Sequence, residues 1–178
     1  ITIDNSLITN IDGAAAAGID VGVYFFSQAI TPEEAIEEAD AVLNAVAGRN
    51  ITYPIVFDWE IIYDDTARTD TMTVEGLADC CVAFCERVKS AGYTPMVYQN
   101  ASTATYKLDL PRIKDYDFWL AEYTDFPTFY YEYDMWQYTF APEGYEQTMF
   151  ITGGLHATEM DGYLSPAHFL PLPADADG

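Results

Sequence analysis

The sequence repeats one local pattern three times: a helical segment, a glycine and then a short run of strand-forming residues. The glycines are Gly18, Gly48 and Gly92, and the runs after them are VGVYFF, YPIVFDWE and PMVYQN. Glycine suits the left-handed residue that ends a helix, and Val, Ile, Tyr and Phe favour a buried strand. Helices that join strands in this way imply parallel neighbours with right-handed crossovers. The pattern therefore predicts an α/β layer or barrel.

The helices of this repeat have recognisable starts. Thr31 can cap one helix, Pro32 fits its first turn and Glu34 completes a capping box. The residues that recur at helical spacing after this start, and that we expect to be buried, are Ile36, Ala39, Leu43 and Val46. The next helix begins near Thr73, and its expected buried face carries Leu77, Cys81, Phe84 and Val88. A shorter helix is expected from about Leu7 to Ala17.

Six segments are strand candidates, at about 21–26, 55–60, 95–100, 117–123, 133–139 and 157–163. The connections between the last three are too irregular to predict full helices. A complete eight-stranded barrel takes about 250 residues, so this chain is expected to lack two strands. We predict one domain over residues 1–165 and a Pro/Ala-rich tail over 166–178. The strand at 21–26 and the last strand would leave open edges, which invite self-association by strand pairing.

The charge of the chain excludes some classes of partner. Twenty-nine acidic and seven basic residues give a formal charge of −22, which would repel nucleic acids and anionic membranes. No continuous apolar stretch is long enough for a membrane span, and the first residues lack the features of a signal peptide. Because the chain starts at Ile1, we expect a processed product or a piece of a longer protein.

Three cysteines, Cys80, Cys81 and Cys85, fall within six residues of one expected helix. This spacing matches neither a disulfide framework nor the separated ligand pairs of a zinc site. We expect these residues to be buried apolar thiols.

Asp58 and Glu60 are the main candidates for catalysis. Side chains two residues apart on a strand share a face, so the two acids point the same way, whereas Ile55, Phe57 and Trp59 face the helices. Acids at the C-terminal end of a parallel strand lie where barrel enzymes place their catalytic residues. The alternative is a solvated strand end, where acidic residues are ordinary.

Other polar and aromatic residues are expected at the same mouth. Those at strand ends are Tyr24, Tyr98, Asn100, Tyr123, Gln137 and Asp161. Aromatic rings beside carboxylates suit a sugar, whose faces are apolar and whose edges carry hydroxyls. Glycoside cleavage needs an acid for the leaving oxygen and a second group for the oxocarbenium-like centre. A carboxyl near an aromatic wall and another acid tends to keep its proton, which suits Glu60 as the donor.

Five blocks of the sequence resemble the glycoside hydrolase family 25 lysozymes, in that family's order and approximate spacing. The blocks are NIDGAAAAGIDVGVYFFSQA, ITYPIVFDWE, FCERVKSAGYTPMVYQN, FWLAEYT and MWQYT, and the resemblance covers about residues 5 to 140. It implies a TIM-like (β/α)5β3 barrel that hydrolyses the β-1,4 bond between N-acetylmuramic acid and N-acetylglucosamine of peptidoglycan glycan strands. It also implies extracellular action by a secreted bacterial or phage-encoded enzyme. No cofactor or metal is expected.

The resemblance implies a role for each matching residue. Glu60 corresponds to the general acid, and Asp58 to the residue that assists the N-acetyl group of the substrate during substrate-assisted cleavage. Asp161 corresponds to the aspartate of the last strand. The substrate contacts would be Tyr98, Tyr123 and Gln137.

The sequence departs from the family pattern in two places. The family's first two strands, the first of which bears another active-site aspartate, would precede Ile1. The last strand of the family reads Asp-x-Asn, whereas this chain has Asp161-Gly162-Tyr163 after an insertion from about Ala141 to Ala157.

Three functions compete on these observations. The first is a muramidase. The second is a non-catalytic remnant that binds peptidoglycan or sugar, which the missing strands and aspartate would explain. The third is a site for Mg²⁺ or Ca²⁺ on Asp58, Glu60 and Asp161, since clustered acids also suit these ions. No basic residue lies nearby to bind the phosphate group of a substrate, and this absence weakens the hypothesis of a metal site.

Overall fold

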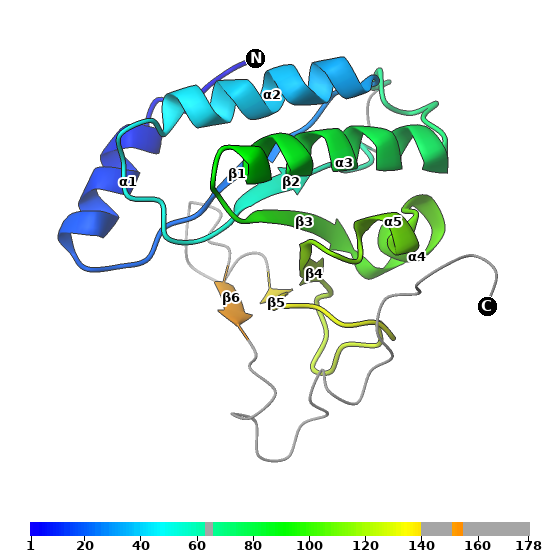
Figure 1. Ribbon diagram of the computed structural model, residues 1–178. Helices are drawn as coiled ribbons and strands as arrows, with labels where there is room; N and C mark the ends of the chain where they lie inside the picture. The colour runs from blue at the N-terminus through cyan, green and yellow to red at the C-terminus, as the bar shows by residue number, and fades with distance from the viewer. Residues whose placement is uncertain (63–65, 140–150, 155–178) are drawn as a thin grey trace. The chain divides into compact units, whose positions relative to one another are not determined.

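The computed structural model describes residues 1–62, 66–139 and 151–154 (Figure 1). The chain divides into two compact units, Ile1–Val97 and Tyr98–Gly178. The elements of the first unit are α1 (Leu7–Ala16), β1 (Val23–Phe26), α2 (Pro32–Ala45), β2 (Ile55–Asp58) and α3 (Val74–Ser90). Strand β3 (Pro95–Asn100) contains the boundary between the units. The second unit continues with α4 (Ala101–Lys107), α5 (Leu110–Ile113), β4 (Asp117–Ala121), β5 (Met135–Thr139) and β6 (Ile151–Gly154).

The core of the first unit lies between its sheet and two helices. Strands β1 and β2 are parallel, with Phe25 opposite Phe57 and Phe26 opposite Asp58. Helices α2 and α3 lie side by side along this sheet (Figure 1). The ring of Phe84 on α3 lies 5.4 Å from that of Phe57 and 6.5 Å from that of Phe25. The face of β2 that carries Phe57 therefore packs on α3, as its alternating sequence predicted.

The three glycine joints have the backbone conformation that the sequence predicts. Gly18, Gly48 and Gly92 have φ angles of 71°, 77° and 89°. Residues with a Cβ atom rarely adopt this left-handed backbone conformation, whereas glycine adopts it without a steric cost. The helix-to-strand connections are therefore fixed locally by the sequence.

Helix α2 starts as predicted but buries a slightly different face. Thr31 Oγ accepts the backbone N–H of Glu34 at 3.3 Å, and Pro32 occupies the first turn. The expected burial of Ile36 is wrong, because this residue is 38% exposed, and Leu43 is only partly buried. The buried residues on this face are Ala35, Glu38, Ala39, Val42 and Val46. The buried face thus includes Glu38, whose carboxylate binds the loop after β1.

Helix α3 agrees with its sequence pattern at both its start and its buried face. Thr73 caps the helix by accepting the N–H of Gly76 at 3.0 Å. The predicted face of Leu77, Cys81, Phe84 and Val88 is buried. The three cysteines are free and buried, which confirms their assignment as core thiols.

The second unit contains both parallel and antiparallel strand pairs. Strand β4 pairs in parallel with β5, and β5 pairs antiparallel with β6. Residues 122–134 between β4 and β5 contain no helix, as predicted. The short helices α4 and α5 were not predicted, and β6 falls inside the expected insertion. The expected strand at 157–163 and the tail at 166–178 lie outside the described residues.

The α/β class is thus confirmed, with helices between parallel strands. Closure into a barrel and the two strands expected before Ile1 remain predictions. None of the described helices is both long and apolar enough to cross a membrane.

The packing of α3 leads to a stability prediction. Val88 is fully buried on this helix, whereas Val74 in its first turn is 41% exposed. We expect Val88→Ala to lower the free energy of unfolding by about 2 kcal/mol, because it leaves a cavity in the core. Val74→Ala should change it by less than about 0.5 kcal/mol. Urea unfolding of both variants measures the difference, and equal losses would contradict the assigned face.

Candidate active site

The end of β2 positions the first of the two candidate acids. Asp58 is the last residue of the strand and is only 6% exposed, on the face opposite to Phe57. Its carbonyl oxygen accepts the backbone N–H of Ser27 at 2.6 Å, which continues the pairing of the two strands beyond β1. Glu60 follows two residues later and is half-buried. The strand thus places Asp58 deeper than Glu60.

The two carboxyl groups share a hydrogen bond, in which Asp58 donates to Glu60. Burial and the charge of Glu60 raise the pKa of Asp58 to about 8. Burial also raises the pKa of Glu60, although the hydrogen bond from Asp58 opposes this shift. The raised pKa of Glu60 agrees with the sequence prediction. However, near neutral pH the shared proton lies on Asp58, because Asp58 is more deeply buried.

Tyr24 on β1 lies near this pair. Partial burial raises the pKa of its hydroxyl, and so do the charges of Asp58, Asp4 and Glu60. Tyr24 is 55% exposed, so it is accessible from solvent. The first unit therefore brings together three of the residues predicted for a sugar site, namely Tyr24, Asp58 and Glu60.

A second group of predicted residues is assembled within the second unit. Oε1 of Gln137 accepts the hydroxyl of Tyr98 at 2.7 Å and that of Tyr123 at 3.4 Å. The ring of Tyr98 also meets Trp119 edge-on, with 4.9 Å between the centroids. Gln137 is fully buried, whereas Tyr123 is half-exposed. The buried Gln137 therefore holds the hydroxyls of both tyrosines.

Asn100, also predicted at the mouth, caps helix α4. Its Oδ1 accepts the N–H of Thr103 at 2.8 Å, and its Nδ2 donates to Thr103 Oγ and to Gln99 Oε1, each at 3.0 Å. Both ends of the amide are thus engaged within the chain. Asp161 lies outside the described residues.

A cavity of about 570 Å³ lies in the first unit, beside β1. Its walls come from the N-terminal segment, α1, β1 and α2, and Tyr24 and Phe26 are among its lining residues. Neither Asp58 nor Glu60 lines it. The cavity therefore borders the outer side of β1, which is the first strand of the sheet, and leaves the two carboxyl groups outside it.

No group of three or more His, Cys, Asp or Glu side chains within the described ranges is arranged to hold a metal ion. The proposed metal site on Asp58, Glu60 and Asp161 includes a residue outside those ranges.

Comparison with known protein families gives a match over most of the chain. The family described as glycosyl hydrolases family 25 matches residues 1–144. The chain therefore belongs to this family, as its five sequence blocks indicated. A search of curated proteins found no match.

Several solved structures share the fold. The modular autolysin LytC from Streptococcus pneumoniae is 24% identical with a TM-score of 0.69, and the match covers 85% of this chain and 37% of that one. The CTP1L endolysin is 26% identical with a TM-score of 0.67, covering 85% of this chain and 52% of that one. A bacterial lysozyme from Streptomyces coelicolor is 19% identical with a TM-score of 0.64, covering 86% and 72%. The match thus spans only about a third to a half of LytC and CTP1L.

The sequence did not predict two acidic residues that accept hydrogen bonds from loops, Glu38 and Glu122. Glu38 binds the loop after β1, and Glu122 accepts the N–H groups of Thr128 and Phe129 after β4. Glu38 lies between Ala35 and Ala39 on α2, so an acid within an apolar stripe was the available signal. Glu122 directly follows a strand, where an acid is ordinary.

The buried acid pair predicts an unusual pH dependence of stability. The folded chain keeps the Asp58 proton up to about pH 8, whereas the unfolded chain releases it near pH 4. The stability that this proton provides is therefore fully present below about pH 4 and is lost as the pH rises through about 8. Relative to Asp58→Asn, the wild type should lose on the order of 4 kcal/mol of unfolding free energy between about pH 5 and about pH 8. Urea unfolding at both pH values tests this, and parallel losses in the two proteins would contradict it.

Proposed function

We propose that this chain is a peptidoglycan hydrolase of the muramidase type. It would cleave the β-1,4 bond between N-acetylmuramic acid and N-acetylglucosamine, with Glu60 as general acid and Asp58 assisting the substrate N-acetyl group. The observation that carries this proposal is the carboxyl pair, which retains one proton near neutral pH beside the partly exposed Tyr24. Membership of glycosyl hydrolases family 25 supports the reaction class.

The two carboxyl groups suit different steps because they differ in depth. Glu60 is the more exposed, so it can reach the leaving oxygen. The shared proton passes from Asp58 to Glu60 along their hydrogen bond and then to that oxygen. Asp58 is left charged, and its carboxylate can orient the N-acetyl group and stabilise the positive charge that develops there. Transfer of this one proton therefore both protonates the leaving oxygen and leaves Asp58 charged. The proposed reaction needs no cofactor.

Sugar contacts are proposed for exposed aromatic residues. Tyr24 and Tyr123 are each about half exposed, and sugars stack on accessible aromatic rings. Tyr98 and Gln137 would act mainly by fixing the hydroxyl of Tyr123 or a bound sugar. Asp161 is proposed as a further active-site acid from the family resemblance alone.

The proposed partner is the glycan strand of a bacterial wall. A structure of LytC has been determined in complex with a synthetic peptidoglycan ligand, which supports this substrate class. Action on such a wall would take place outside the cell, by a secreted bacterial or a phage-encoded enzyme.

Removal of the proton donor is the direct test. We expect Glu60→Gln to slow the clearing of a bacterial wall suspension by at least about 100-fold, because an amide cannot protonate the leaving oxygen. Glu37→Gln is the matched control, since Glu37 is exposed on α2. Equal clearing by wild type and Glu60→Gln would disprove the assignment.

A wall-binding module is the alternative outcome of the same assay. In that case the wild type would bind insoluble wall without producing new reducing ends. Reducing ends formed at an enzyme-like rate would exclude it.

The pH profile tests how the proton is shared. Above about pH 8 the pair loses its proton, so the rate of reducing-end release should fall by about tenfold per pH unit. Initial rates between about pH 5 and about pH 10 measure this limb. A flat profile through about pH 10 would show that the Asp58 proton is not used.

A further inference from the structure

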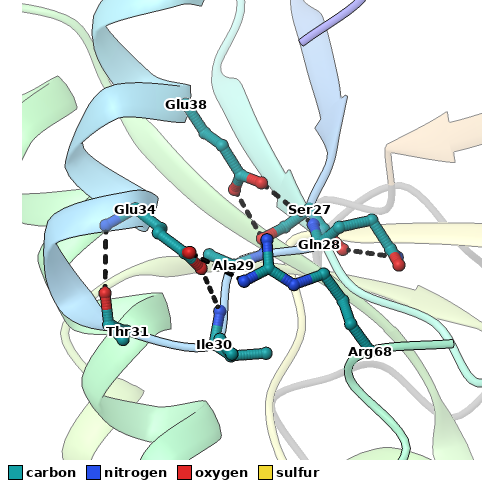
Figure 2. A network of polar contacts seen from close by, with 8 residues as sticks. All are labelled: Ser27, Gln28, Ala29, Ile30, Thr31, Glu34, Glu38 and Arg68. Carbon is teal, nitrogen blue, oxygen red and sulfur yellow. Dashed lines mark hydrogen bonds and ion pairs between the residues drawn. The ribbon is translucent and has the colours of Figure 1, made fainter.

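The loop between β1 and α2 is held by a buried acid, Glu38 (Figure 2). We propose that Glu38 is a positioning residue of the active site, which fixes the end of β2, and hence Asp58, through Ser27. The kinetic part of this inference rests on the proposed function, whereas the structural part does not.

Glu38 uses both carboxylate oxygens on this loop. Its Oε2 accepts the hydroxyl of Ser27 at 2.6 Å, and its Oε1 accepts the backbone N–H of Gln28 at 2.9 Å. The Ser27 hydroxyl oxygen also accepts the N–H of Ala29 at 3.3 Å. Figure 2 shows the Glu38 side chain directed from α2 at these groups. Glu38 therefore holds Ser27 and Gln28 directly, and Ala29 is tied to the same group through the Ser27 hydroxyl.

Ser27 transmits this restraint to the candidate site. It is fully buried, and its backbone N–H donates to the Asp58 carbonyl at 2.6 Å. The same residue thus binds Glu38 through its side chain and Asp58 through its backbone. Displacement of Ser27 would release the end of β2 at the point where the chain turns from Asp58 toward Glu60.

The restraint acts through geometry rather than through charge. The charge that raises the pKa of Asp58 is that of Glu60, and Glu38 is not among the causes of that shift. Burial raises the pKa of Glu38 itself, while its bonds to Ser27 and Gln28 lower it. A buried carboxyl is costly unless its partners are well placed, so its loop contacts must be well formed.

A second acid of α2 fixes the other end of the loop, but at the surface. Glu34 accepts the N–H of Ile30 at 2.9 Å and pairs with Arg68 at 2.7 Å (Figure 2). Arg68 is about half-exposed, and exposed ion pairs contribute little. Glu38 is therefore the member of this network expected to matter for the site.

Kinetics separate positioning from substrate binding. On solubilised glycan strands, we expect Glu38→Ala to lower kcat by about tenfold or more and to change KM by less than about threefold, because small misplacements slow catalysis. Glu38→Gln keeps an acceptor for Gln28 and a partner for Ser27, so it should restore kcat to within about threefold of wild type. Glu37→Ala, an exposed neighbour on the same helix, should leave both constants unchanged.

Amide hydrogen exchange tests the structural part without any activity. The Ser27 amide should exchange about tenfold faster in Glu38→Ala than in wild type or Glu38→Gln, while the Val88 amide inside α3 keeps its rate. If Glu38→Ala does not fold, Ser27→Ala replaces it, with faster exchange of the Gln28 and Ala29 amides expected. Unchanged exchange, or equal acceleration at Val88, would overturn the proposal. If the wild type does not hydrolyse glycan strands, that result refutes only the proposed function. The exchange rate of the Ser27 amide still tests whether Glu38 positions the loop and the end of β2.

Discussion

The hydrogen bond from the Ser27 N–H to the Asp58 carbonyl is the constraint on which the candidate site depends. It lies where β1 ends and where β2 changes from a core strand into the segment that carries Glu60. On one side Phe57 packs on Phe84 of α3, and on the other Glu38 holds Ser27. The backbone of Asp58 is therefore fixed from both the helix layer and the loop.

A fixed and buried backbone explains why the two acids differ. Asp58 cannot turn outward into water, so it retains its proton and donates it to Glu60. Glu60 lies beyond the strand and remains partly exposed, which leaves it free to meet a ligand. Burying a carboxyl group at position 58 costs folding free energy, and such a cost is typical of functional sites.

Local signals predicted much of this arrangement. Glycine joints, the Thr31 and Thr73 caps and the alternation around Phe57 depend only on neighbouring residues, and the structure agrees with each. The sequence placed Asp58 and Glu60 on one face, and in the structure the two carboxyl groups influence each other's pKa; their catalytic roles stay a prediction. It did not predict which acid lies deeper, because alternation gives the face of a side chain but not its depth.

The errors also have a common physical cause. Ile36 and Ala35 lie on adjacent stripes of α2, and apolarity alone favours Ile36. The observed face also buries Glu38, whose carboxylate binds Ser27 and Gln28, and apolarity alone does not predict that polar contact. In the second unit, Gln137 is likewise buried and holds the hydroxyls of two tyrosines. In each unit a buried polar group supports a candidate ligand-facing residue. Gln137 was expected at the site, whereas Glu38 was not, because Glu38 lies within a helix and away from the strand ends where site residues were sought.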